Sequence, residues 1–158
     1  MKIIILRGKM NAGKTTTCGL VYSELVKIAN KEHLFNRETV FEDSLRLTKE
    51  GKSVIDFAAV LTIGKLKIGI ISEGDIAEKL NCAVEIMKLL KVDVIICCTR
   101  SVNSKGSSYR MILDNYAKEH EIVKEVWVKR SDKLKDKFLV KEKAVNEVVK
   151  QIKSLTNQ

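Results

Sequence analysis

Residues 7–17 read RGKMNAGKTTT and place Gly8 and Gly13 five positions apart. The run Ile3–Leu6 before them is continuously apolar, as expected of a strand that is buried on both faces. Apolar residues at helical spacing follow within Lys14–Asn30. A buried strand, a tight glycine turn and a helix in direct succession predict a strand–loop–helix unit, which is typical of an α/β fold.

The rest of the chain alternates between strand-like and helical stretches. Val54–Ile63 and Leu66–Ser72 flank a tight turn at Gly64, which predicts an antiparallel hairpin. The other predicted elements are helices over Asp75–Lys91, Tyr109–His120 and Leu139–Leu155, and strands over Val92–Cys98 and Ile122–Val128. We therefore expect one three-layer α/β domain over residues 1–158, with a mostly parallel sheet and one antiparallel hairpin strand at an edge.

Composition argues against several classes of protein. No apolar run approaches the ~18 residues of a membrane span, and Met1–Leu6 is too short for the apolar part of a signal peptide. The four cysteines form no CxxC pair, which predicts buried free thiols and a cytoplasmic location. The net charge of +9 suits an anionic partner, but interspersed acids and few aromatic residues argue against a nucleic-acid platform.

The stretch Gly8–Thr15 matches the pattern G-x-x-x-x-G-K-[ST] in full. In such a loop the glycines let backbone amides surround a phosphate, and the following helix adds its N-terminal amides and positive dipole end. Lys14 is then expected at the β- and γ-phosphates, and the Thr15 hydroxyl at Mg²⁺. The residues predicted to contact nucleotide in this loop are Gly8, Lys9, Met10, Asn11, Ala12, Gly13, Lys14, Thr15 and Thr16.

On these residues the chain resembles the P-loop NTPases, in which this stretch is the Walker A loop. GKMNAGKTTT is also similar to the GKGGxGKTTT loop of the septum-site and plasmid-partition ATPases. The resemblance implies the three-layer P-loop NTPase fold, ATP as the ligand, and a dimer in which Lys9 reaches the nucleotide of the partner. Met10 and Asn11 depart from that family's pattern, because they replace its paired glycines.

A carboxylate near Mg²⁺ is expected at the end of an apolar strand. KIGIISEGD resembles a Walker B segment, with Ser72 where that family often has Asp. Glu73 is predicted to hold the metal through water or to act on the attacking water. Asp75 is either a further acid of the site or only the N-cap of the next helix. If hairpin partners sum to about 128, Asp56 lies opposite Ser72 and is either a metal ligand or an exposed edge residue.

The leading hypothesis is a Mg²⁺-dependent ATPase whose nucleotide state controls a contact with a protein partner or a second copy. Lys14, Glu73 and Lys9 would be its catalytic residues. Arg100, just beyond Val92–Cys98, or Arg110 would stabilise phosphate charge, and the alternative is that each is a solvated surface residue. The sequence contains no NKxD segment, which favours ATP over GTP.

Two other functions fit the same loop. The first is a small-molecule or nucleotide kinase, with residues 31–52 as its acceptor segment and the Ser101–Arg110 loop as a short lid. A short helix is predicted over Phe41–Lys49, ending at Gly51. The charged residues of the acceptor segment are Arg37, Glu42, Asp43 and Arg46.

The second alternative function is a binding module that retains nucleotide without turnover.

Overall fold

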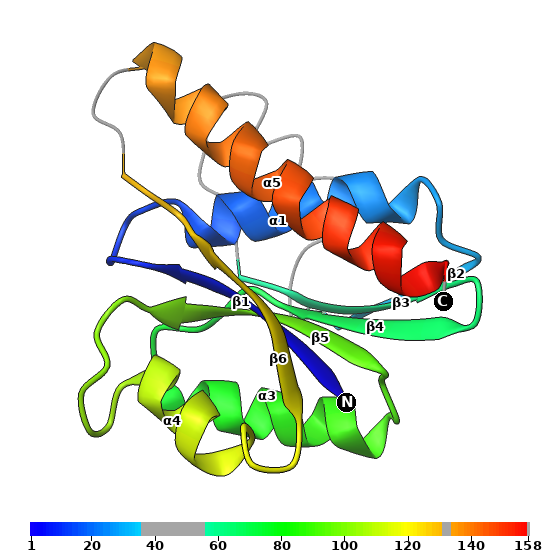
Figure 1. The fold of residues 1–158 in the computed structure, drawn as a ribbon, viewed down its shortest axis with the longest axis horizontal. Coiled ribbons are helices and arrows are strands. Elements are labelled where there is room, and N and C mark those ends of the chain that lie inside the picture. Colours follow the sequence, from blue (N-terminus) through cyan, green and yellow to red (C-terminus); the bar gives the residue numbers. More distant parts are fainter. Residues whose placement is uncertain (36–55, 131–133, 158) are drawn as a thin grey trace.

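The computed structural model describes residues 1–35, 56–130 and 134–157. The strands are β1 (Lys2–Gly8), β2 (Lys31–Phe35), β3 (Ala58–Ile63), β4 (Leu66–Ile71), β5 (Val94–Arg100) and β6 (Glu121–Trp127). The helices of the same ranges are α1 (Lys14–Val26), α3 (Ala77–Leu89), α4 (Ser108–Asn115) and α5 (Leu134–Thr156). Helices α1 and α5 cover one face of the sheet, and α3 and α4 cover the other (Figure 1). The predicted α/β arrangement is therefore confirmed.

The sheet has the strand order β2-β3-β4-β5-β1-β6. β1 runs parallel to β5 and β6, and β4 runs parallel to β5. β3 is antiparallel to both β2 and β4, so within the described sheet it is the one strand that opposes the others. The prediction of a mostly parallel sheet with one antiparallel hairpin strand is confirmed. Its expected place at an edge is wrong, because β2 pairs with β3 and forms that edge.

The hairpin of β3 and β4 turns at Gly64, as predicted. Its register places Phe57 opposite Ser72. The Ser72 N–H donates to the Phe57 carbonyl (3.0 Å), and the Phe57 N–H donates to the Ser72 hydroxyl (2.7 Å). The predicted pairing of Asp56 with Ser72 is therefore wrong by one residue.

Some predictions lie outside the described residues. They are the short helix over Phe41–Lys49 and the four charged residues of the kinase acceptor segment. The predicted strand start at Val54 also lies outside them, and β3 begins only at Ala58.

The helices differ from prediction mainly at their ends, where boundaries are least well determined by sequence. α1 ends at Val26 rather than Asn30, and α5 begins at Leu134 rather than Leu139. None of the four helices in the described ranges combines the length and the apolar character needed to cross a membrane.

The core lies on both faces of the sheet, and β1 supplies each face alternately. Ile3 and Ile5 pack toward α3 and α4, whereas Ile4 and Leu6 pack toward α1 and α5. All four side chains are fully buried. This explains the continuous apolar run, since a strand covered on both faces has no polar alternation. The apolar run ends just before Gly8, where β1 ends and the glycine loop begins.

Candidate functional site

The glycine loop, Gly8–Thr15, links the end of β1 to the start of α1. Gly13 is the N-cap of α1 in a left-handed conformation, with φ of 91°, and no side chain caps the helix there. The first N–H groups of α1 have no acceptor within the helix, so they can donate hydrogen bonds to a ligand bound at the loop. Positively polarised amides of this kind favour an anion.

The residues of the loop differ in exposure. Lys9, Met10 and Asn11 are exposed at its tip, whereas Ala12 and Lys14 are buried. The Ala12 N–H donates to the Lys9 carbonyl (3.2 Å), which closes the loop. The loop is thus held by its own backbone, and its exposed tip faces outward.

Lys14 is only 6% exposed, so its ammonium needs partners within the protein. Its Nζ donates to the Lys9 carbonyl (2.9 Å) and lies 3.2 Å from the Asp75 carboxylate. The same carboxylate lies 4.0 Å from the Arg100 guanidinium. Asp75 therefore sits between two cations, one of them inside the glycine loop.

Asp75 reaches Lys14 because the chain after β4 crosses the carboxyl end of β5, which lies between β4 and β1. Gly74 makes this crossing possible: a Cβ at Gly74 would lie 1.7 Å from the Cys98 carbonyl oxygen. The alternative role of Asp75 as an N-cap is wrong. Ile76 is the N-cap of α3, and no side chain accepts a hydrogen bond there.

Thr15, Asp56 and Ser72 form a second group beside the start of α1. The Thr15 hydroxyl donates to Asp56 Oδ1 (3.0 Å), and the Ser72 hydroxyl donates to the same oxygen (3.2 Å). Ser72 is 2% exposed and also accepts from the Phe57 N–H, so its position is fixed. The structure thus brings together two predicted residues from distant parts of the chain, Thr15 and Asp56.

Glu73 is not part of this group. Its carboxylate pairs with Lys79 at 2.7 Å, on the surface at the start of α3. Across residues 1–35, 56–130 and 134–157, no three Asp, Glu, His or Cys side chains form a ready-made metal cage. A metal ion beside Thr15 would therefore draw on one hydroxyl, one carboxylate, and oxygen atoms from ligand and water.

A groove of about 460 Å³ opens beside Asp75, between the tip of the glycine loop and the segment after β5. Its lining residues are Met10, Asp75, Ile76, Arg100, Val102, Ser104, Lys105, Gly106 and Ser107. Arg100 and Lys105 give it positive charge, and Asp75 gives it one carboxylate. The predicted lid segment, Ser101–Arg110, therefore forms one wall of a space next to Lys14.

No protein-family model, curated protein or solved structure matches the chain. A proposal about function therefore rests on the geometry of the site residues described above.

Arg7 is a residue that sequence reasoning missed. Its Nε and Nη2 donate to the Ser101 carbonyl at 3.1 and 2.7 Å. Its guanidinium lies 3.5 Å from the ring centre of Tyr109 and 4.6 Å from that of Trp127. Arg7 immediately precedes Gly8, so its side chain connects the start of the glycine loop to the segment that forms one wall of the groove. The sequence signal that could have indicated a role for Arg7 is its charge at the end of an apolar strand.

Lys141 of α5 was also missed. A Cβ on Gly13 would lie 2.9 Å from Lys141 Cε and 3.5 Å from its Nζ, so this side chain ends at the glycine loop. Nothing in the sequence marks it, since α5 contains many lysines and this contact depends on how α5 packs on α1.

Proposed function

We propose that the chain is a P-loop NTPase that binds ATP with Mg²⁺ at the glycine loop and hydrolyses it. One observation carries the proposal: the Thr15 hydroxyl donates to the Asp56 carboxylate at the uncapped start of α1, next to the buried Lys14. The three features are the ones that a phosphate chain with its cation requires, namely free amides, a fixed ammonium, and oxygen ligands for the metal.

Each residue of the loop then has a role. The amides of the first turn of α1 and of the loop hold the β-phosphate, and Lys14 neutralises the terminal phosphates. Bound phosphate would replace Asp75 as the partner of the Lys14 ammonium. Asp75 would remain beside Arg100, facing the groove where an attacking water can enter.

Thr15 and Asp56 would hold Mg²⁺, because a hydroxyl and a carboxylate on one side leave the remaining positions for phosphate and water. When bound, the ion stabilises the negative charge that develops on the transferred phosphoryl group. Asp56 would then be the carboxylate that holds the metal, a role for which the sequence offered both Asp56 and Glu73. Ser72 fixes the Asp56 carboxylate through its hydroxyl.

A kinase is the second candidate, and the groove favours it. Arg100 and Lys105 line a space of about 460 Å³ that begins at Asp75, which in turn contacts Lys14. A phosphoryl acceptor with an anionic group would fit beside the terminal phosphate. ADP formation without any acceptor supports the ATPase. ADP formation only when an acceptor is added supports the kinase.

A nucleotide-dependent dimer remains part of the proposal. Lys9 is exposed at the tip of the loop, while its carbonyl accepts from both Lys14 and Ala12. An exposed ammonium on a fixed backbone is suited to reaching the nucleotide of a second copy. Sedimentation of wild type and Lys9→Ala with Mg²⁺–ATP tests this, and equal monomer mass in both would contradict it.

Thermal unfolding with ATP, GTP and no nucleotide, each with and without Mg²⁺, tests the central proposal. A ligand at a hundred times its dissociation constant adds about 2.7 kcal/mol, or roughly 5–11 °C at this size. We expect a Mg²⁺-dependent rise with ATP that is lost in Lys14→Ala. Lys27→Ala is the matched control, because Lys27 is an exposed lysine at the end of the same helix, paired with Glu24. No shift in wild type would contradict the proposal.

A further inference from the structure

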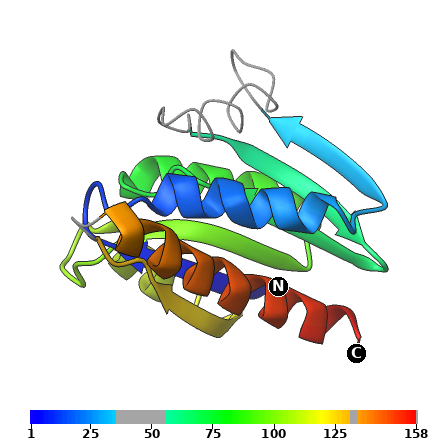
Figure 2. The same cartoon turned by 90° about the horizontal axis from the view of Figure 1, so that it is seen from above.

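Helix α5 lies beside α1 on one face of the sheet (Figure 2). The two helices share one apolar cluster, to which α1 contributes Cys18, Val21 and Leu25, and α5 contributes Ala144, Val145, Val148 and Ile152. Lys141 precedes Ala144 and Val145 by one helical turn and so belongs to the same face of α5. Packing of the two helices therefore carries Lys141 toward the start of α1.

The end of the Lys141 side chain rests on Gly13. The position of a Cβ on Gly13 lies 3.5 Å from Lys141 Nζ and 2.9 Å from Cε, which places the flexible end of this side chain against the loop. The N-terminus of α1 carries a partial positive charge, so an anion bound at Gly13 would be attracted by the helix end and by the Lys141 ammonium together.

Lys14 and Lys141 reach the loop from elements that lie on different sides of β1. Lys14 pairs with Asp75, which follows β4, and β4 and β5 lie on one side of β1. β6 lies on the other side and is joined to α5 by an ion pair between Lys124 and Glu147 (3.3 Å). We therefore expect a phosphate chain held by the loop to have Lys14 near one end and Lys141 near the other.

We propose that Lys141 is a third cationic ligand of the nucleotide, beside Lys14 and the loop amides, and that it contacts the phosphate nearest the nucleoside. The inference rests on the proposed function and deepens it, because it makes α5 part of the nucleotide site. Lys14 then serves the terminal phosphates. Lys141 serves the α-phosphate, which both ATP and ADP carry.

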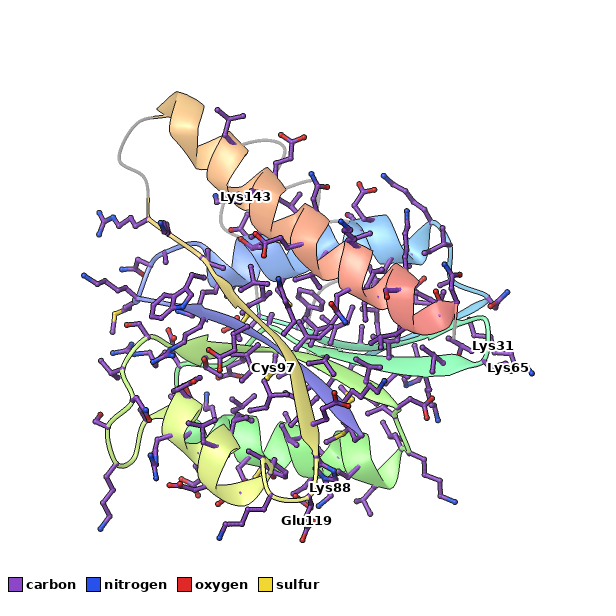
Figure 3. All side chains as sticks on the ribbon, viewed as in Figure 1. Lys31, Lys65, Lys88, Cys97, Glu119 and Lys143 are labelled. Carbon is purple, nitrogen blue, oxygen red and sulfur yellow. The ribbon has the colours of Figure 1, made fainter. Side chains whose placement is uncertain are left out.

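Dissociation constants of Mg²⁺–ATP and Mg²⁺–ADP for wild type, Lys141→Gln, Lys143→Gln and Lys14→Ala test the inference. Lys143 is a matched control, because it is an exposed lysine on the same helix (Figure 3). We expect Lys141→Gln to weaken both nucleotides about tenfold, as for a lost charge-assisted contact. Lys143→Gln should leave both constants unchanged. Lys141→Arg should restore most of the affinity, since it keeps the charge.

Phosphorus NMR of bound ADP adds a readout that a purely structural role would not change. The α-phosphorus signal should differ between wild type and Lys141→Gln, while the two proteins unfold at the same temperature without nucleotide. Equal affinities for Lys141→Gln and Lys143→Gln, in a wild type that binds ATP, would overturn this inference alone. A wild type that binds neither nucleotide would overturn the proposed function and the inference together.

Discussion

The Asp75 carboxylate lies 3.2 Å from the Lys14 ammonium, where the phosphates of a nucleotide would be expected. Removing this carboxylate should have two opposite effects. Without nucleotide, Asp75→Asn removes this ion pair from a buried ammonium that keeps its hydrogen bond to the Lys9 carbonyl. The loss should cost about 1 kcal/mol, because Asp75 is itself half exposed. With nucleotide, the competing anion is gone, so the dissociation constant of Mg²⁺–ATP should fall by about threefold or more.

Urea unfolding measures the first effect, and titration calorimetry measures the second. Asp114→Asn is the control, because Asp114 is an exposed acid paired with Arg110 on α4. Weaker ATP binding by Asp75→Asn would show that this carboxylate does not compete with phosphate.

The hydrogen bond between Thr15 and Asp56 leads to a prediction about metal dependence. Asp56→Asn should reduce the strengthening of ATP binding by Mg²⁺ by about tenfold, as expected when a ligand set is damaged. Glu73→Gln should leave it intact, because Glu73 pairs with Lys79 and not with Thr15. The measurement is ATP affinity over a Mg²⁺ series, with excess chelator as the zero point. The opposite ranking of the two variants would assign the metal to Glu73.

The contact of Gly74 with the end of β5 predicts a large effect from one methyl group. Gly74→Ala should destabilise the protein by about 3 kcal/mol or more, because its Cβ would lie 1.7 Å from a backbone oxygen, which cannot move aside as a side chain can. Gly64→Asn is the control, since no atom of the described residues lies within 4 Å of its Cβ position and Asn tolerates its φ of 59°. Chemical denaturation measures both. Equal stability of the two variants would contradict the crossing over β5.

The cysteines predict how the chain responds to thiol reagents. Cys82 is exposed, whereas Cys18, Cys97 and Cys98 are buried, Cys97 within the sheet (Figure 3). A hydrogen bond with the Cys98 thiol, together with burial, raises the pKa of Cys18, and burial raises the pKa of Cys97. We expect one fast-reacting thiol in the native protein at pH 8, lost in Cys82→Ser, and four in urea.

The raised thiol pKa values also set the sign of a pH effect. The folded state keeps these thiols protonated at a pH where the unfolded chain ionises them. Their contribution to the free energy of unfolding is therefore complete below pH ~9 and decreases above it. Urea unfolding at pH 8 and at pH 10 measures the change. Rapid reaction of all four thiols in the native protein at pH 8 would contradict the burial.

The sequence predicted those parts of the site that depend on neighbours along the chain. The apolar run Ile3–Leu6, the glycines and the helical spacing after Lys14 are local signals, and β1 and α1 follow them. The two-strand hairpin is local as well. The predicted register of the hairpin was wrong by one residue, because the register depends on how many residues the turn contains.

The parts that could not be predicted depend on strand order and helix packing. Asp75 meets Lys14 only because β5 lies between β1 and β4, and a linear pattern does not contain that order. Lys141 meets Gly13 only because α5 packs on α1. β2 was missed for a different reason: most of its side chains are exposed, so it has no apolar alternation.

The position of β1 also affects how the protein can be made. β1 is the first strand of the chain, yet its two partners are β5 and β6, with Lys2 opposite Val94 and Glu121. While a ribosome synthesises the chain, the apolar segment Ile3–Leu6 has no strand to pair with until β5 has emerged. We therefore expect this segment to be prone to aggregation during synthesis, and chaperone dependence to be greatest for nascent chains that stop short of β5.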